Sequence, residues 1–255
     1  MPSIILKNNP RVSIITVVFN GEKYIEKTIQ SVLNQTYNNI EYIIVDGGST
    51  DGTIGIIEKY AANIRWITEP DKGIYDAMNK GISIASGDWL NFLNGDDYFF
   101  NNEVLSTVFN NDTLLPESSF VYGDSVNIAI GFQRYIKARA LTKDSVRKGL
   151  GTCHQAMFVK RSIAPFYDIN YKYKAEYNWV IDILNEIPQQ SIIQLEIPIV
   201  YYVLGGFSEV GLMKNTGEFI SITKRRFGWV QALKNFPVYV IIFLRHLKYK
   251  YIGYA

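Results

Sequence analysis

Cysteine and histidine are nearly absent from this sequence of 255 residues. Its one cysteine is Cys153, and its two histidines are His154 and His246. A single cysteine excludes an internal disulfide, and these three residues are too few for the Cys/His cluster of a structural zinc site. We therefore expect a protein that folds in a reducing, cytosolic compartment.

Long hydrophobic runs and the commonest nucleotide-binding signatures are also missing. Residues 1–11 contain only a short apolar run, so we expect neither a secretory signal nor a membrane-spanning start. The pattern G-x-G-x-x-G does not follow the first long apolar run, where Phe19-Asn20-Gly21-Glu22 stands, and no G-x-x-x-x-G-K-[ST] occurs. Ordinary NAD enzymes and P-loop ATPases are therefore disfavoured.

The sequence does contain enough apolar residues for a folded α/β core. Hydrophobic residues make up 47% of the chain and charged residues 20%, as in ordinary soluble domains. In the first hundred residues, apolar runs alternate with helical patterns, which predicts a mostly parallel sheet with right-handed crossovers. We expect strands over residues 12–19, 40–45, 64–68 and 88–93, and helices over residues 22–33, from 53 to about 60, and 77–85.

After residue 97 the pattern becomes less regular. Residues 192–203 form a long apolar run that contains Pro198, which predicts an edge strand or a bend. No internal repeat and no low-complexity linker occurs before Gly205, so we expect function to reside in one α/β body. The other predicted elements are strands over residues 120–122, 132–137 and 156–159 and a helix over residues 176–184.

Two adjacent carboxylates, Asp96 and Asp97, follow the apolar run at residues 88–93. Like charges side by side repel each other unless a cation or a hydrogen-bond network stabilises them. Open α/β sheets bind ligands at the carboxyl ends of their strands, and oxygen ligands suit Mg²⁺ or Mn²⁺, which often bridge to a diphosphate. The pattern favours a metal-assisted nucleotide site, and the plainer alternative is a solvated turn.

Four segments together resemble glycosyltransferase family 2 with the GT-A fold. They are residues 12–20 (VSIITVVFN), 31–37 (SVLNQTY), 44–53 (IVDGGSTDGT) and 87–97 (GDWLNFLNGDD), in this order. Residues 69–81 and 153–156 resemble the bacterial branch that builds exopolysaccharide, O-antigen and colanic-acid-like repeat units. The resemblance covers about residues 10–210 and implies an α/β fold with a mostly parallel, twisted sheet flanked by helices.

The resemblance also implies how the chain is organised. We expect a GT-A catalytic domain over residues 1–213, with a nucleotide-sugar half at about 10–97 and an acceptor half at about 98–213, followed by a basic amphipathic tail at 214–255. The implied reaction moves a sugar, with inversion at the anomeric carbon, from a nucleotide-diphosphate donor to an acceptor hydroxyl. A lipid-linked glycan in surface polysaccharide assembly is the expected acceptor.

The family pattern implies two donor residues at the ends of the first strands. Phe19 and the turn at Asp46 would hold the nucleotide base and ribose. The chain departs from the pattern directly after Asp46, because Gly47 stands where the family has a second acidic residue that commonly contacts the base. The nucleobase that the chain reads is therefore left open.

The family's Asp-x-Asp motif is represented by Asn94-Gly95-Asp96. Asp96 is the expected ligand of Mn²⁺ or Mg²⁺, and Asn94 and Asp97 lie beside it as further donor-site candidates. Asn94 is the second departure, because a neutral amide replaces the first carboxylate. A divalent ion in this position would stabilise the leaving diphosphate as a Lewis acid.

Transfer also needs a base, because the acceptor hydroxyl has a high pKa and must lose its proton as the bond forms. Residues 171–179 match the family segment that carries this base, and Glu176 lies at the acidic position. Composition alone would favour a surface glutamate near a helix N-terminus. Further donor or acceptor candidates are Asp71, Lys72, Asp76, His154 and Gln155.

Two other functions fit part of the pattern. A sugar-1-phosphate nucleotidyltransferase should carry a glycine-rich, basic loop near the N-terminus, and Asn20-Gly21-Glu22-Lys23 is no such loop. A non-catalytic carbohydrate-binding protein would not need both Asp96 and Glu176. The expected partners are a nucleotide-diphosphate sugar and an acceptor glycan, without nucleic acid, and the oligomeric state stays open.

The C-terminal tail concentrates positive charge. Residues 214–255 contain eight Lys or Arg and one acid, Glu218, a net charge of +7 that leaves −5 on the rest of a chain whose total is +2. Aromatic residues and the apolar run 238–244 lie among these charges, which suits an anionic membrane surface better than nucleic acid. We expect peripheral attachment to the inner face of the cytoplasmic membrane, or instead a helix packed on the body with a solvated basic face.

Overall fold

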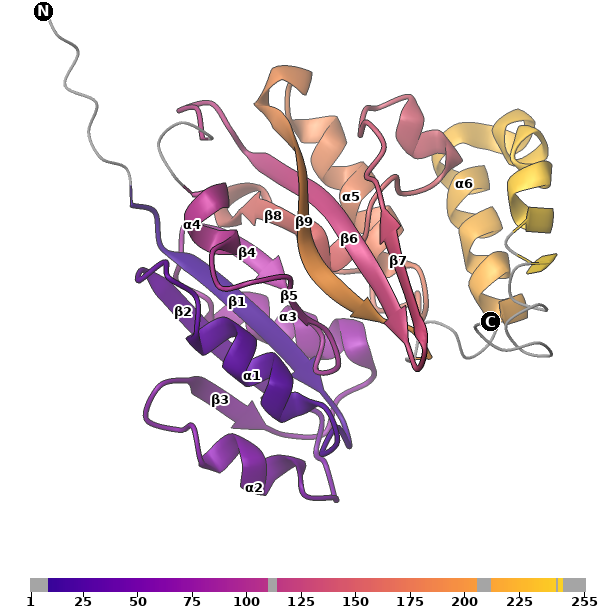
Figure 1. Ribbon diagram of the computed structural model, residues 1–255. Helices are drawn as coiled ribbons and strands as arrows, with labels where there is room; N and C mark the ends of the chain where they lie inside the picture. The colour runs from indigo at the N-terminus through magenta and orange to yellow at the C-terminus, as the bar shows by residue number, and fades with distance from the viewer. Residues whose placement is uncertain (1–8, 110–113, 206–211, 242, 245–255) are drawn as a thin grey trace, which may run out of the picture.

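The computed structural model describes residues 9–109, 114–205, 212–241 and 243–244 (Figure 1). One twisted sheet runs through the molecule in the order β3-β2-β1-β4-β8-β6-β9-β5, and β7 pairs with β6 beside this path. Helices lie against both faces of the sheet. The predicted α/β class is confirmed.

The N-terminal half of the sheet is parallel. β1 pairs with β2 and β4, and β2 pairs with β3, all in the parallel direction. All seven residues of β1 are buried, as expected of a β-branched run that is covered on both faces. The carboxyl ends of these strands therefore meet at one edge of the sheet. Their bounds are β1 (Val12–Val18), β2 (Ile40–Asp46), β3 (Arg65–Thr68) and β4 (Trp89–Phe92).

Helices cover this half from both sides. Apolar residues of α1 (Ile25–Leu33), α2 (Thr53–Glu58) and α4 (Val104–Val108) pack on one face, and those of α3 (Ile74–Ile84) pack on the other. α3 approaches β1 closely at Gly81, where an added Cβ would lie 2.4 Å from Cγ2 of Ile15. A larger residue at position 81 would therefore push α3 away from β1.

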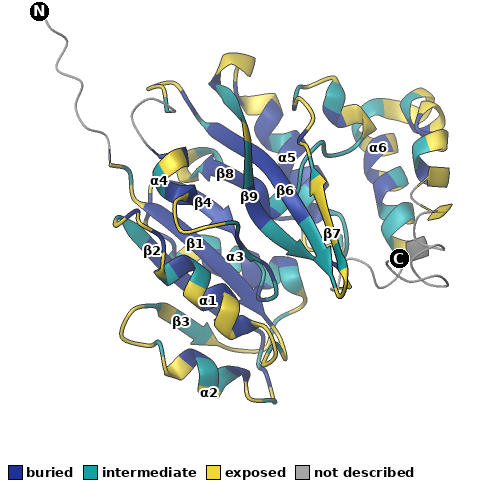
Figure 2. Cartoon of the chain, in the orientation of Figure 1, coloured by how far each residue is buried: buried dark blue, intermediate teal, exposed yellow. Residues whose placement is uncertain are grey.

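The C-terminal half of the sheet is mixed. β4 pairs antiparallel with β8, β8 with β6 and β5 with β9, whereas β6 and β9 are parallel. The central strands are buried, while much of the hairpin strand β7 is exposed (Figure 2). The bounds are β5 (Tyr98–Phe99), β6 (Phe120–Ala129), β7 (Phe132–Ile136), β8 (Met157–Lys160) and β9 (Ile192–Val203).

One strand differs from the sequence prediction, and one agrees with it in part. β6 runs to Ala129, well beyond the expected end at residue 122, because Gly123 continues the strand where β9 passes closely. A Cβ on Gly123 would lie 2.6 Å from Cγ1 of Ile199. β9 is an edge strand only in part, because β5 flanks it at Val200 and Tyr201, whereas Pro198 pairs with β6 alone, where the register shifts. The pairing therefore agrees with an edge position at Pro198 itself.

Helix α5 (Ala175–Glu186) packs against the face that carries α3, and α6 (Leu212–Lys234) packs beside it. The Phe219 ring of α6 lies 4.8 Å from the ring of Tyr177. Part of the tail therefore packs on the body. The predicted domain boundary at residue 213 lies within α6, and it stays a prediction. Short 3-10 turns lie at Ser145–Lys148, His154–Ala156, Arg161–Ile163 and Gln189–Ser191.

The described part of the chain contains no helix that is both long enough and apolar enough to cross a membrane.

Candidate active site

The turn after β2 is built around the carboxylate of Asp46, which is fully buried. Its Oδ2 accepts hydrogen bonds from the backbone N–H groups of Gly48 (3.0 Å) and Ser49 (2.9 Å). The Thr68 hydroxyl donates to the same oxygen at 2.6 Å, and the Ser49 hydroxyl donates to Oδ1. Asp46 thus fixes the shape of the turn through local bonds, and its predicted contact with a nucleotide stays a prediction.

An aromatic ring and a carboxylate lie side by side at the same edge. Phe19 follows β1 and is 62% exposed. A Cβ added to Gly47 would lie 2.4 Å from Oδ2 of Asp71 and 3.5 Å from Cδ2 of Phe19. The Asp71 carboxylate therefore fills the space beside Gly47 where a longer side chain would otherwise extend. A flat ring with a neighbouring hydrogen-bond acceptor is suited to a nucleobase.

The two other candidates in this loop make local contacts at the start of α3. Lys72 is exposed, and its backbone N–H donates to Oδ2 of Asp76 at 3.0 Å. Asp76 also lies 3.8 Å from Nζ of Lys80 in an i,i+4 pair. These contacts involve Lys72 and Asp76 in the start of α3, and their predicted contact with donor or acceptor stays a prediction.

The two adjacent aspartates after β4 point to different places. Asp97 is 1% exposed, and its Oδ1 accepts a hydrogen bond from the backbone N–H of Val203 at 2.8 Å. Its backbone carbonyl accepts the Thr28 hydroxyl at 2.7 Å. Asp96 instead is partly exposed and lines a cleft. Asp97 therefore ties the loop to β9 and α1, while the half-buried Asp96 lines the cleft.

Both carboxyl groups are held in an unfavourable environment for charge. Burial raises the pKa of Asp96. Burial, reinforced by the charge of Asp96, raises the pKa of Asp97 well above its usual range. Nearby, Oδ1 of Asn94 is buried and has no hydrogen-bond partner among the described residues. A cation at this loop would favour the charged form of Asp96 and supply a partner to an orphaned oxygen.

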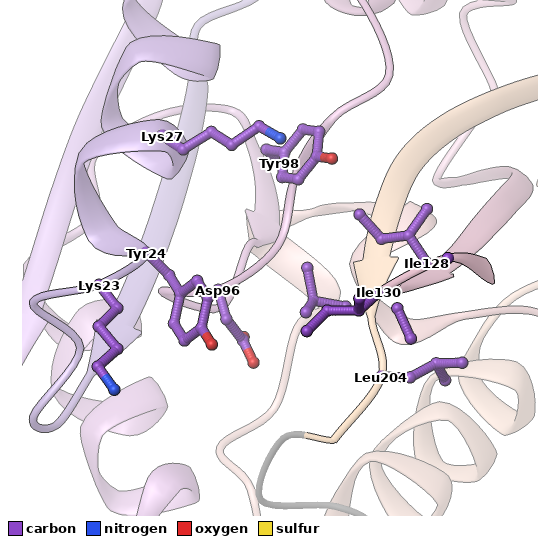
Figure 3. A pocket seen from close by; sticks show the side chains of 11 residues that line it. Lys23, Tyr24, Lys27, Asp96, Tyr98, Ile128, Ile130 and Leu204 are labelled. Atoms are coloured by element: carbon purple, nitrogen blue, oxygen red, sulfur yellow. The ribbon is translucent and has the colours of Figure 1, made fainter. Parts of the chain in front are cut away.

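The cleft beside Asp96 has a volume of about 710 Å³. Lys23, Tyr24 and Lys27 line it from the start of α1, together with Asp96 and Tyr98 (Figure 3). Nζ of Lys27 lies 3.6 Å from the centre of the Tyr98 ring. Aliphatic side chains form the wall across from these polar groups (Figure 3). They come from Ile128, Ala129, Ile130, Val203 and Leu204.

Glu176 lies in the first turn of α5 and is partly buried. Its Oε2 accepts a hydrogen bond from the Tyr75 hydroxyl, which belongs to the first turn of α3. Oε1 lies 3.5 Å from Nζ of Lys174. Burial and the charge of Glu176 together raise the pKa of Tyr75 well above its usual value, so Tyr75 acts as a donor to Glu176. The carboxylate orientation is thus fixed from a separate helix.

A cluster of stacked rings connects Glu176 to the strand that leads to Asp96. Tyr75 stacks on Tyr167 with centroids 5.5 Å apart, and Tyr167 stacks on Trp179 of α5 at 5.0 Å. Phe92, the last residue of β4, lies 5.3 Å from Tyr167 and 5.8 Å from Trp179. The positions of the α5 N-terminus and of the Asp96 loop are therefore coupled through packing.

His154 and Gln155 lie between these two parts of the site. The His154 ring stacks on Phe92 at 5.4 Å, and its Nε2 forms a hydrogen bond with the Tyr167 hydroxyl at 2.7 Å. Gln155 is buried, and its Oε1 accepts from Sγ of Cys153 at 2.8 Å. Burial raises the pKa of the Cys153 thiol, and the charges of both Asp97 and Glu176 add to this shift. The charges of Asp97 and of the base candidate Glu176 thus both act on this turn.

The environment of His154 predicts acid sensitivity. Burial lowers the pKa of His154 to about 4, against a smaller opposite effect of Glu176. An unfolded histidine titrates near pH 6.5, so below that pH the unfolded chain binds a proton that the folded chain excludes. The free energy of unfolding should fall as pH drops from about 6.5 towards about 4, with a limiting slope of about 1.4 kcal/mol per pH unit.

Urea unfolding of the wild type and of His154→Gln at a series of pH values measures this dependence. The variant should lose less stability than the wild type between neutral pH and about pH 5. The other histidine, His246, is present in both proteins, so it does not contribute to a difference in acid sensitivity between them. Equal acid sensitivity of the two proteins would show that His154 is already protonated in the fold or that other groups dominate.

Comparison with known proteins assigns the family. Residues 13–161 match Glycosyl transferase family 2. The chain belongs to this family. It is therefore a glycosyltransferase, and the alternatives of a nucleotidyltransferase and a non-catalytic binding protein are excluded as its primary class. The chain is similar to a PGL/p-HBAD biosynthesis glycosyltransferase of Mycobacterium bovis, with 31% identity over 215 residues, which cover 81% of this chain and 80% of the relative.

Solved structures confirm the GT-A fold of this family 2 enzyme. S. aureus TarS residues 1–349 in complex with UDP-GlcNAc is similar with a TM-score of 0.67 and 17% identity, over 94% of this chain and 73% of that chain. Glucosyl-3-phosphoglycerate synthase from Mycobacterium tuberculosis, in complex with Mn²⁺ and UDP, gives a TM-score of 0.57 and 18% identity over 86% and 80%. At 17% and 18% sequence identity, these similarities show the fold alone.

The residues around Asp96 fit a divalent ion that is held mainly by its substrate. The described residues contain no group of three or more His, Cys, Asp and Glu side chains that could enclose a metal ion. They do offer the open carboxylate of Asp96 and the unpartnered Oδ1 of Asn94. Mg²⁺ and Mn²⁺ accept such sites, because one or two protein ligands suffice when phosphate oxygens and water complete the shell.

Tyr75 and Tyr167 were missed by the sequence reasoning. Tyr75 lies between Ile74 and Asp76 in the segment 69–81. The predicted candidates in this segment are its charged residues Asp71, Lys72 and Asp76. Nothing in the apolar periodicity predicts that its hydroxyl reaches Glu176, which is 101 residues away in sequence. Contacts of this kind depend on tertiary structure, and no local pattern indicates them.

Proposed function

We propose that this family 2 enzyme transfers a sugar from a nucleotide-diphosphate donor to the hydroxyl of a lipid-linked glycan, with a divalent metal ion and with inversion. One observation carries the proposal: Asp96 opens into a cleft at the end of β4, while the ring cluster on the same strand holds Glu176 of α5. The packed elements around β4 would then position both a metal-bound diphosphate and a base.

The donor nucleotide is expected at the edge formed by β1 and β2. The exposed Phe19 ring offers a stacking surface, and the neighbouring Asp71 carboxylate offers an acceptor for an N–H of the base. Asp46 supports both by fixing the turn between them. The metal ion, held by Asp96 with Asn94 beside it, supplies the Lewis acidity that stabilises the leaving diphosphate.

Glu176 is the proposed base for the acceptor hydroxyl. Tyr75 donates to Oε2, and Lys174 lies near Oε1, so the carboxylate is oriented before substrate arrives. A carboxylate on the face opposite the leaving group takes the proton as the hydroxyl attacks, which gives inversion in a single displacement. His154 supports this arrangement through its hydrogen bond with Tyr167 and its stacking on Phe92.

The cleft beside Asp96 supports an amphiphilic acceptor. One wall carries Lys23 and Lys27, and the opposite wall is aliphatic, with Ile128, Ile130 and Leu204 (Figure 3). A phosphate group near the lysines and a hydrocarbon chain on the aliphatic wall would satisfy both walls. A lipid-diphosphate-linked glycan has this chemistry, and such acceptors of surface polysaccharide assembly lie at the inner face of the cytoplasmic membrane, where we propose that the enzyme works.

Calorimetric titration with UDP, GDP and dTDP, each with and without Mn²⁺, tests the donor site. We expect one nucleotide to bind preferentially and to bind more tightly when Mn²⁺ is present. Absence of binding by every nucleoside diphosphate under both conditions would contradict the proposed donor site. Equal affinity with and without metal would instead remove the metal from the proposal.

Phe19→Ala should weaken donor binding by roughly tenfold to a hundredfold, the usual loss when a base no longer stacks on an aromatic ring. Turnover at saturating donor should change little, because stacking contributes equally to the ground state and the transition state. Phe166→Ala is a matched control, because Phe166 is 61% exposed and Phe19 is 62% exposed. Donor affinity that is equally reduced in both variants, or in neither, would contradict the assignment of Phe19.

A further inference from the structure

The C-terminal helices expose an unusual concentration of large apolar side chains. Fifteen large hydrophobic residues of the described chain are exposed, and eight of them lie between residues 229 and 244. Trp229 is 62% exposed and Leu233 is 71% exposed, whereas Trp89 and Trp179 are buried. We name these eight residues the apolar surface. It consists of Trp229, Val230, Leu233, Phe236, Val240, Ile241, Phe243 and Leu244.

The orientation of this surface is fixed by contacts on the other side of the same segment. Gly228 has a φ of 82°, which breaks α6 and redirects the chain. Ala232, Asn235 and Tyr239 then face the body and are buried. Nδ2 of Asn235 donates to the backbone carbonyl of Arg147 at 2.6 Å, and the Tyr239 ring lies 5.4 Å from Phe219. The segment is thus anchored by its buried residues, and its large apolar residues are left exposed.

The charges beside the apolar surface are positive. No acidic residue follows Glu218 in the sequence, and the Glu218 carboxylate accepts the backbone N–H groups of residues 172–174. Arg225 and Arg226 are engaged by acidic side chains of the body. Lys224 and Lys234 are exposed, without an ion-pair partner in the described ranges, and Nζ of Lys224 lies 3.9 Å from the centre of the Trp229 ring.

We propose that the apolar surface docks into the interface of an anionic lipid bilayer, with Lys224 and Lys234 against lipid phosphates. Apolar and aromatic side chains enter the boundary between headgroups and acyl chains, while lysines remain at the phosphate level. The proposed membrane contact is residues 229–244 and not the whole tail, because the preceding part of α6 packs on the body. It does not require transferase activity.

Charge argues against a second copy of the chain as the occupant. A twofold interface would bring the same basic surface of two copies together. With no acidic residue in this segment, the lysines of one copy would meet the lysines of the other. An anionic bilayer satisfies both the apolar and the basic groups.

Sedimentation of the full chain with lipid vesicles tests the proposal without donor or acceptor. Vesicles of phosphatidylcholine with phosphatidylglycerol are compared with vesicles of phosphatidylcholine alone, at low and high salt. The variant W229S/L233S/F236S should bind roughly a thousandfold more weakly to anionic vesicles, since each of the three buried side chains contributes about tenfold. K224Q/K234Q should lose roughly fivefold per lysine on anionic vesicles only.

Matched controls make the result specific. L115S/F166S/I169S also removes three exposed apolar residues and should bind vesicles as the wild type does. Thermal melting confirms that each variant is folded, and quenching of Trp229 fluorescence by brominated lipid reports insertion directly. The proposal is overturned if W229S/L233S/F236S binds like the wild type, or if the control variant loses as much. It is also overturned if the wild type binds no vesicles and sedimentation velocity shows a dimer that the same three substitutions dissociate.

Discussion

Replacement of Asp96 by alanine is expected to lower the rate of sugar transfer roughly a thousandfold, because the leaving diphosphate loses its electrostatic stabilisation. The fold should survive, since Asp96 is partly exposed and the neighbouring Asp97, not Asp96, bonds to Val203. Donor binding should also lose its dependence on Mn²⁺. Calorimetric titration of the nucleotide with and without metal, beside an assay of transfer, measures both effects.

Asp144→Ala is the matched control for this change, because the Asp144 side chain is 91% exposed and pairs with Arg147 of its own turn. It should keep full transfer and full metal dependence. Unchanged metal-dependent affinity in Asp96→Ala would contradict the assignment of Asp96. Asn94→Ala should have a smaller effect, because a neutral amide contributes less than a carboxylate to a divalent ion.

Glu176→Gln should lower turnover by roughly a hundredfold or more, the usual scale for loss of a general base. The affinity for the donor should stay the same, because the proton is taken only as the acceptor attacks. Glutamine keeps the size of the side chain and one oxygen for the Tyr75 hydroxyl, so the packing of α5 is preserved. Single-turnover kinetics with saturating donor separate chemistry from binding.

Glu186→Gln, at the exposed end of the same helix, is the control and should leave turnover unchanged. The turnover of Tyr75→Phe should lie between that of Glu186→Gln and that of Glu176→Gln. In this variant Glu176 keeps its carboxylate and loses one of the groups that orient it. Near-normal turnover of Glu176→Gln with its true acceptor would mean that another group is the base. Asp71 and Asp76 would then be tested next.

The sequence predicted the parallel half of the sheet well because its signals are local. A fully buried, β-branched strand such as β1 has a continuous apolar run, and the turns after β1 and β2 carry small and capping residues. Two short elements, β5 and α4, were not predicted, since two and five residues are too few for a periodic pattern. The predicted end of β6 came too early because a glycine usually interrupts a strand pattern. The close contact of Gly123 with β9 cannot be seen in the sequence.

The candidate site was predicted in part, for a similar reason. Asp96 and Glu176 could be selected as candidates because they lie in recognisable local motifs. The different roles of Asp96 and Asp97 depend on which side chain meets β9, and adjacent residues look alike in sequence. The position of Asp71 beside Gly47 depends on how two loops meet, as does the bond from Tyr75 to Glu176. Such contacts between segments need the fold to be known.

Release of nucleoside diphosphate from a panel of nucleotide sugars tests the central claim most directly. The wild type, Asp96→Ala and Glu176→Gln are each incubated with Mn²⁺, a donor and a lipid-diphosphate-linked acceptor fraction. We expect the wild type to turn over at least one donor, faster with acceptor. Both variants should lose this activity, and only Asp96→Ala should lose metal-dependent donor binding. No release from any donor, or release of pyrophosphate from a nucleoside triphosphate and a sugar 1-phosphate instead, would contradict the central claim.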